Sequence, residues 1–261
     1  MIWRVEKNGH TAYLVGTAHF FPYSFARSLA KLFRTVETVL FEGPLDQASL
    51  QRIAEHGRQG QAAPSLAEAL APESICEIDR QLSRRLRFQN GEEHYLLWPS
   101  PSPNYFELYT RGLRPWLAFF SIWSTCLDWP YSVDMEGFRL AQRLGKRVHF
   151  LETLEEQLAV LDGIPFERIV RQLNEVSHWP QYSERYVAFF LAGNLTGLMA
   201  LTDNFVSRGR PVISERDAIL QQRMKPIFDR QTAAAFVGFP HIPGICRLFL
   251  DQGYNVIQEI E

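Results

Sequence analysis

Two histidines lie in the same local pattern at opposite ends of the 261-residue chain. His19 closes Gly16-Thr17-Ala18-His19, and His241 closes Gly238-Phe239-Pro240-His241, each just after an apolar stretch. Two neutral imidazoles and a carboxylate are a common ligand set for a divalent metal ion. A metal ion held in this way lowers the pKa of bound water and polarises a carbonyl group. The pattern therefore points to a metal centre that activates water.

Two glutamates follow apolar stretches in the same way, namely Glu42 and Glu152. In an α/β sheet, ligands collect at the carboxyl ends of the parallel strands. If the strands are parallel neighbours, we expect the two histidines and the two glutamates to converge there. Arg216 is predicted to lie early on the helix before the last motif strand, where a fixed guanidinium would stabilise a developing oxyanion.

Each of these residues also has a purely structural interpretation. The histidines are compatible with hydrogen-bonded structural roles, and Glu42 with a helix cap. Glu152 has a possible partner in Arg147, and Arg216 is compatible with a charge on a helix surface. A third G-x-x-H string, Gly91 to His94, lies in a polar stretch without a strand before it, and we interpret it as accidental.

The hydrophobic pattern predicts the elements that position these residues. The first two strands, Ile2 to Glu6 and Thr11 to Val15, form a hairpin around Asn8-Gly9. Ser214 is the expected N-cap of the helix that carries Arg216. Further strands are predicted at Thr38 to Phe41, Arg147 to Leu151, Ala233 to Val237 and Tyr254 to Ile257, with helices at Phe25 to Phe33, Asp134 to Leu144, Ser214 to Phe228 and Ile245 to Asp251.

The order of strand, G-x-x-H, helix, strand and acid occurs twice, at 11–42 and at 233–259, the second time ending at Glu259. Residues from about 47 to 130 read as a helical insertion, and the proline-rich run from Pro99 to Pro103 as a linker between helices. We therefore predict a single α/β domain over residues 1–261. Its central mixed sheet contains two strand–G-x-x-H–helix–strand units and is surrounded by many helices.

Composition argues against several functional classes. The net charge is −2 and the pI is about 6.4, so no nucleic-acid partner is expected. The three cysteines are far apart and form no C-x-x-C pair, which speaks against disulfides and a structural zinc site. The one basic cluster is interpreted as the solvated face of a helix: Arg80, Arg84, Arg85 and Arg87.

No membrane span is expected either. The stretch from Tyr186 to Val206 is long enough, but polar residues and glycines interrupt it, and two buried helices joined near Asn194 explain it better. The first residues contain no basic segment followed by an apolar run, so no signal peptide is predicted and a cytoplasmic location is expected.

Taken together, these motifs resemble the TraB/GumN/PrgY family, which belongs to the superfamily of the Tiki proteases. Asp217 departs from the family's usual asparagine, and Phe239-Pro240 replaces the small residues common inside the second motif. The matching segments follow the family's order along the chain: Gly16-Thr17-Ala18-His19, Phe41-Glu42-Gly43, Arg114-Pro115-Trp116, Leu151-Glu152-Thr153, Glu215-Arg216-Asp217 and Gly238 to Gly244.

The resemblance implies a metal-dependent hydrolase. In the Tiki branch, the two motif histidines and the strand-end glutamate are assigned to a metal centre, and manganese or cobalt supports peptide cleavage. By this resemblance His19, His241 and Glu42 are metal ligands or acid/base residues, with zinc as a further possible ion. Arg216 and Glu152 become supporting site residues.

The leading hypothesis is thus a metal-assisted hydrolase acting on a peptide bond. Glu42 is either a third ligand or the general base, and Arg216 stabilises the tetrahedral intermediate. One alternative is a binding protein for a peptide, a signal molecule or haem. The other is a metal-free, esterase-like hydrolase with His19 as general base and Glu42 as its orienter. The substrate, peptide or small molecule, the metal and the oligomeric state stay open.

Overall fold

A mixed β-sheet forms the centre of the protein, and a computed structural model describes residues 1–58, 65–89, 104–209 and 213–259. Within these ranges the sheet has six strands in the order β4-β3-β5-β2-β1-β6. The strands are β1 (Ile2–Lys7), β2 (His10–Thr17), β3 (Thr38–Phe41), β4 (Arg147–Phe150), β5 (Ala233–Gly238) and β6 (Asn255–Glu259). The predicted α/β class is confirmed.

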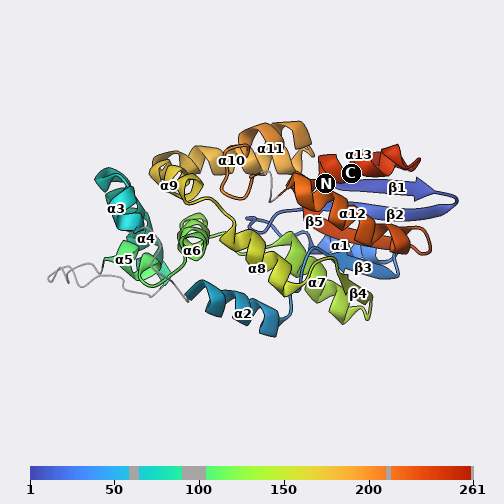
Figure 1. Ribbon diagram of the computed structural model, residues 1–261, viewed down its shortest axis with the longest axis horizontal. Coiled ribbons are helices and arrows are strands. Elements are labelled where there is room, and N and C mark those ends of the chain that lie inside the picture. The colour runs from blue at the N-terminus through green and yellow to red at the C-terminus, as the bar shows by residue number, and fades with distance from the viewer. Residues whose placement is uncertain (59–64, 90–103, 210–212, 260–261) are drawn as a thin grey trace.

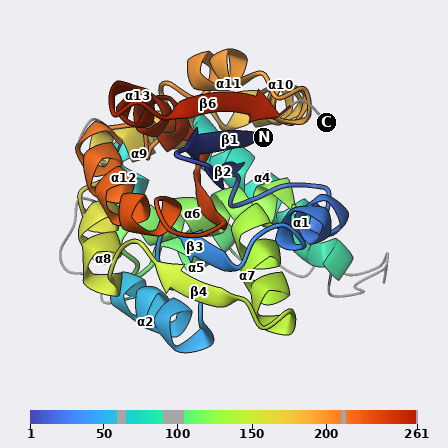
Figure 2. The same cartoon turned by 90° about the vertical axis from the view of Figure 1, so that its right-hand side faces the viewer.

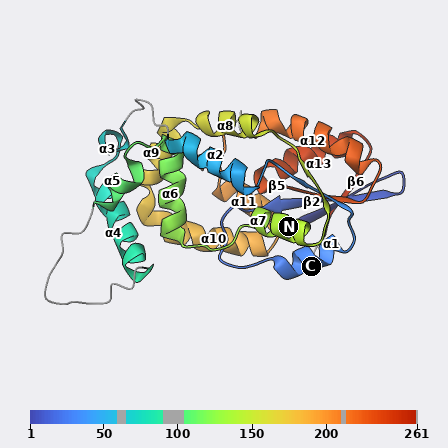
Figure 3. The ribbon, with the colours of Figure 1, turned by 90° about the horizontal axis from the view of Figure 1, so that it is seen from below.

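The helices gather in two groups along an elongated molecule (Figure 1). One group packs around the sheet, and the other forms a helical end that contains α3 to α6 and α9. Figure 3 shows α8 and α10 extending between the two groups. The helices are α1 (Ala26–Phe33), α2 (Gln47–Arg58), α3 (Leu66–Ala69), α4 (Pro72–Gln89), α5 (Tyr105–Thr110), α6 (Pro115–Leu127), α7 (Val133–Arg143), α8 (Leu154–Asp162), α9 (Phe166–Asn174), η1 (Val176–His178), α10 (Trp179–Leu191), α11 (Leu195–Leu201), α12 (Ser214–Phe228), η2 (Phe239–His241) and α13 (Ile242–Asp251).

The strands that carry the motifs are parallel neighbours, as the sequence predicts. β5 pairs in parallel with β2, where Thr17 lies opposite Gly238, and in parallel with β3. The β1–β2 hairpin turns at Asn8 and Gly9, whose φ angles of 51° and 81° lie in the left-handed region that these residue types tolerate. The carboxyl ends of β2, β3 and β5 therefore meet at one edge of the sheet.

Both faces of the sheet are buried under helices. Phe41 and Phe236 point into a core that includes residues of α1 and α7, whereas Leu40 and Ala235 point into a core built with α12 and α13. Figure 2, along the long axis, shows these two helix pairs on opposite sides of the sheet. Burial on both faces explains why β3 and β5 read as unbroken apolar runs instead of alternating patterns.

Some sequence expectations need correction. Ser214 is the first helical residue of α12 and not its N-cap, because the cap position belongs to Ile213. The acid of the second pattern repeat, Glu259, lies within the last strand and does not follow it. β6 pairs with β1 at the opposite edge of the sheet, and Glu259 forms an ion pair with Arg4 at 2.7 Å.

Other expectations are met in full or in part, or lie outside the described residues. α10 and α11 meet at Asn194, as expected, and its side chain accepts the Gly197 N–H at 2.8 Å and caps α11. The expectation that both helices are buried is wrong, because only Trp179 and Phe190 of α10 and Leu198 of α11 are buried. None of the helices in the described ranges is long and apolar enough to cross a membrane. The Gly91 to His94 string and the Pro99 to Pro103 run fall outside the described residues.

Candidate active site

The carboxyl edge of the sheet brings residues from both ends of the chain into one pocket of about 480 Å³. His19 comes two residues after β2, and Glu42 directly follows β3. His241 ends the short η2 turn after β5. All three side chains line this pocket together with Arg216 from α12. Because the strands are parallel neighbours, these side chains lie at one edge of the sheet, as expected from the sequence.

Arg216 forms the centre of a buried ion network. Its Nε donates to Oε1 of Glu152 at 2.7 Å and its Nη2 to Oε2 at 2.6 Å, a two-pronged contact that fixes the guanidinium plane. Nη2 also donates to Oε1 of Glu42, and Nη1 lies 3.4 Å from Nε2 of His241. Arg216 is thus no surface charge, and Arg216, not Arg147, is the ion-pair partner of Glu152.

Glu42 is held as a carboxylate. Burial alone would raise its pKa, but the positive charge of Arg216, the nearby His241 and the Gly238 N–H lower the pKa to about 2. The Gly238 N–H donates to Oε2 at 2.9 Å, so both carboxylate oxygens are engaged. At neutral pH this residue therefore carries a fixed negative charge beside the two imidazoles.

His241 is oriented by the residue that follows Arg216. Its Nδ1 lies 2.7 Å from Oδ1 of Asp217, and its side chain is 3% exposed. Because an ionised carboxylate only accepts hydrogen bonds, Nδ1 carries the proton in this pair. Nε2 is then left facing Oε1 of Glu42 at 3.9 Å.

The same arrangement recurs at the other motif. Nδ1 of His19 lies 3.0 Å from Oδ2 of Asp134, a buried carboxylate in the first turn of α7. The His19 ring is open to water inside the pocket, with 69% of its side chain exposed. Imidazoles that bind metals or move protons commonly donate their second ring N–H to a carboxylate. Both motif histidines satisfy this condition.

Sequence reasoning missed the two aspartates as site residues. Asp134 has the signature of an ordinary first-turn acid that complements a helix dipole, and it does occupy that position in α7. Asp217 was noticed only as a departure from the family pattern. No local signal marks its role, because consecutive residues of a helix point about 100° apart and Arg216 therefore says nothing about where Asp217 lies.

The charge of Asp134 determines the proton affinity of His19. The surrounding pocket walls remove part of the hydration of the ring and oppose protonation, although the ring is open to the pocket. The charge and hydrogen bond of Asp134, aided by Glu42, outweigh this and raise the pKa of His19 to about 9. In chelator-treated protein, Asp134→Asn is therefore expected to lower this pKa toward or below the ordinary value of about 6.5. An NMR pH titration measures it, with the His19 signal assigned by its loss in His19→Gln. An unchanged pKa would show that Asp134 does not control the imidazole.

The rest of the pocket is largely apolar and aromatic. α6 and α10 supply much of the wall facing the sheet edge, and Phe239 of the second motif contributes directly beside His241. Trp116 at the start of α6 is fixed because its Nε1 donates to Asp162 at 3.0 Å. The aromatic side chains that line the pocket are Phe20, Trp116, Phe120, Trp123, Trp129, Tyr182, Tyr186, Phe205 and Phe239.

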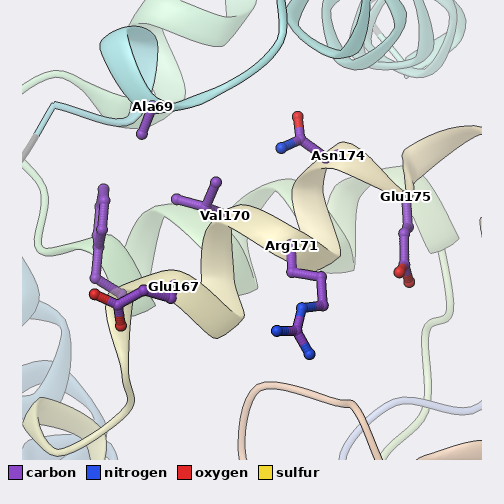
Figure 4. Close-up of a pocket in the computed structure, with 7 residues that line it drawn as sticks. Ala69, Glu167, Val170, Arg171, Asn174 and Glu175 are labelled. Carbon is purple, nitrogen blue, oxygen red and sulfur yellow. The ribbon is translucent and has the colours of Figure 1, made fainter.

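A second hollow of about 600 Å³ lies beside α9, away from the motifs (Figure 4). Glu167 and Arg171 of α9 and Glu175, which directly follows that helix, supply its charged side chains, and Ala69 lies across from them. Its lining contains no histidine or cysteine, and we assign no chemistry to it.

The imidazole and carboxylate groups at the sheet edge are of the types that bind divalent metal ions, but they are not arranged as a preformed metal site. Among the residues that the structure describes, no three His, Cys, Asp or Glu side chains are grouped closely enough to hold an ion. Arg216 donates a hydrogen bond to Oε1 of Glu42 and would compete with a metal ion for this oxygen. If Arg216 releases Glu42, it still keeps its two hydrogen bonds to Glu152. The carboxylate of Glu42 would then be available to a metal ion.

The model of one protein family, the TraB/PrgY/gumN family, matches residues 1–258, which is nearly the whole chain. The chain belongs to the TraB/PrgY/gumN family. No curated protein and no solved structure matches it. For this TraB/PrgY/gumN chain, the structure adds the positions of the motif residues relative to one another, which the sequence does not give.

The structure places the two segments that we interpret from the sequence as departures from the family pattern. Asp217 still offers a side-chain oxygen to His241, as the usual asparagine would. Phe239 and Pro240 line the pocket, and the proline lies within the first two residues of η2, where a missing N–H costs nothing. Neither change displaces His241 from the site.

Proposed function

We propose that this protein is a metal-assisted hydrolase that cleaves peptide bonds in apolar substrates. The observation that carries the proposal is the matched pair of imidazoles, His19 with Asp134 and His241 with Asp217. Both lie beside an ionised glutamate at the polar end of an aromatic pocket. The family resemblance supports a hydrolytic reaction, and the apolar walls support an apolar substrate.

His19 and His241 are the proposed metal ligands through Nε2, with Glu42 as the third once Arg216 releases its Oε1. A divalent ion, manganese or cobalt by resemblance and zinc as a further candidate, would supply an acidified water molecule and polarise the substrate carbonyl. Asp134 and Asp217 keep each imidazole in the tautomer that leaves Nε2 free to donate its lone pair.

Arg216 is the proposed stabiliser of the oxyanion that forms when the carbonyl is attacked. Its guanidinium is fixed by Glu152, so it requires little reorganisation during the reaction. Glu152 is therefore a positioning residue. Thr17 supplies a buried hydroxyl on the pocket wall that lacks a hydrogen-bond partner in the described part of the chain. We propose that this hydroxyl holds water in the site.

The metal-free alternative has weaker support. It requires Glu42 to orient the His19 imidazole, whereas Nδ1 of His19 lies 3.0 Å from Oδ2 of Asp134. Binding without turnover stays a distinct outcome of the test below.

Metal analysis of the purified protein tests the proposal. Wild-type protein is expected to retain manganese, cobalt or zinc after dialysis and to cleave peptides with that ion present. His19→Ala and His241→Ala are expected to lose both properties. His56→Ala is the matched control, because His56 also pairs with an aspartate, Asp162 at 2.8 Å, but does not line the pocket.

Equal metal content in the wild type and in both motif variants would contradict the proposed ligands. Metal-dependent retention of an intact peptide, without cleavage, would replace the hydrolase by a binding protein.

A further inference from the structure

Two buried side-chain atoms have no hydrogen-bond partner in the described residues: Oγ1 of Thr17 and Nη1 of Arg208. Both residues line the same pocket. Folded proteins rarely leave buried polar atoms unpaired, because each one forfeits its hydrogen bonds to water. Both atoms are closed to solvent in this structure, so a bound molecule would contact either of them only after its side chain turns toward the pocket. Arg208 is the more informative of the two, because it carries a charge.

Arg208 has little inside the protein to balance that charge. Its Nη2 contacts the thioether sulfur of Met199 at 2.9 Å, a weak acceptor, and its guanidinium carbon lies 5.8 Å from the centre of the Phe239 ring. No carboxylate of the described residues lies within ion-pair distance. Burial lowers the pKa of Arg208, partly offset by the more distant charge of Asp203. A guanidinium in such surroundings is suited to bind an external anion.

The position of Arg208 relates it to the second motif. The ring it faces, Phe239, lies two residues before His241, on the same pocket wall. A planar anion held by this guanidinium therefore lies at the border between the aromatic wall and the polar sheet edge. Arg216, the other arginine of the pocket, is already engaged with Glu42 and Glu152, so the two arginines have different roles.

We propose that Arg208 binds the carboxylate of an apolar ligand, and that the ligand is a short peptide with a free C-terminus and an apolar last residue. Its apolar side chains would pack on the aromatic wall, and Arg208 would contact the carboxylate in the two-pronged geometry that arginine favours. The peptide identity rests on the proposed hydrolase function, whereas the carboxylate contact does not. A fatty acid offers the same chemistry and is distinguished by the test.

Calorimetric titration of the full-length chain with two ligand pairs tests the contact without requiring turnover. The probes are N-acetyl-Leu-Phe and its C-terminal amide, and decanoate and decanamide. A charge-assisted contact predicts that wild type binds the carboxylate of the peptide pair about 10- to 100-fold more tightly than the amide. Arg208→Gln is expected to abolish this preference by weakening the binding of the carboxylate far more than the binding of the amide.

Arg185→Gln is the matched control, because Arg185 also lies over a phenyl ring, that of Phe189, but not in the pocket. It should keep the full preference for the carboxylate. Because Arg208 makes only a weak contact with Met199 and packs over Phe239, Arg208→Gln should unfold cooperatively at a denaturant concentration close to that of wild type.

The outcomes separate the carboxylate contact from the proposed hydrolase. An Arg208-dependent preference in the peptide pair supports the proposal even if no metal binds and no peptide is cleaved. A preference for the carboxylate that occurs only in the decanoate pair overturns the peptide as the proposed ligand but supports the contact between Arg208 and a carboxylate. Equal affinities within both pairs, or a preference that survives in Arg208→Gln, overturn the proposal altogether.

Discussion

Replacing Arg216 with methionine is expected to lower the free energy of unfolding by about 3–5 kcal/mol. The substitution leaves Glu152, whose side chain is 3% exposed, and Glu42, at 14%, as buried carboxylates without their cation. Removing one partner of a buried ion network costs more than the network contributes, because the remaining charge has lost both its partner and its water. Urea unfolding followed by circular dichroism measures the difference.

Arg223→Met is the matched control on the same helix. Arg223 pairs with Glu156 at 2.7 Å, but 41% and 39% of the two side chains are exposed, so water and salt screen the interaction. The loss expected there is below about 1 kcal/mol. Similar losses in the two variants would show that burial of the Arg216 network has no energetic consequence.

A second substitution identifies the cause of the loss. Adding Glu152→Gln to Arg216→Met removes one uncompensated charge, and the double variant is expected to recover part of the lost stability. If the double variant is less stable than Arg216→Met alone, repulsion among the remaining charges is not the reason for the loss. The position of Arg216 in the centre of the candidate site would then need another explanation.

The sequence predicts the sheet edge well because the signals there are local. Continuous apolar runs such as those of β3 and β5 are typical of strands buried on both faces, and a glycine after the run marks the exit of the chain. Once those strands are parallel neighbours, the carboxyl-edge rule places His19, Glu42 and His241 together without any knowledge of side-chain contacts. The result depends on topology more than on packing.

The partners of these residues are not predictable in the same way. Asp134 looks like any acid in a first helical turn, and only the packing of α7 against the sheet brings it to His19. Nη1 of Arg208 has no hydrogen-bond partner because the described segments of the fold place no acceptor near it. A local sequence pattern cannot predict this. Arg216 was placed correctly on its helix, but its partner Glu152 is 64 residues away in sequence.

Asp217 offers the second large effect, this time on function. Asp217→Ala removes the acceptor of the His241 Nδ1–H and is expected to weaken metal affinity, or turnover if the hydrolase proposal holds, by about 10- to 100-fold. Asp217→Asn keeps a side-chain carbonyl that accepts the same hydrogen bond, and its loss is expected to be no more than a few-fold. Metal affinity is measured by competition with a chelator, and turnover with a peptide substrate.

The contrast between the two substitutions separates positioning from general stability. Asp203→Ala is the matched control, because Asp203 is exposed and contributes no side chain to the pocket lining. Equal losses in Asp217→Ala and Asp217→Asn would mean that the charge, and not the orientation of the imidazole, is what the site requires. Equal performance of Asp217→Ala and wild type would remove Asp217 from the site altogether.

Gly244 provides an independent way to disturb the same contact. A Cβ atom at this position in α13 would lie 1.9 Å from Oδ2 and 2.7 Å from Cγ of Asp217, so that the carboxylate must move. Gly244→Ala is therefore expected to reproduce the functional loss of Asp217→Ala by displacing the carboxylate, without removing any polar group from the site. This crowding gives a physical reason for the closing glycine of the second motif: it leaves space for the side chain that orients His241. If Gly244→Ala retains wild-type metal affinity, the orientation of His241 does not depend on the close fit between Gly244 and Asp217.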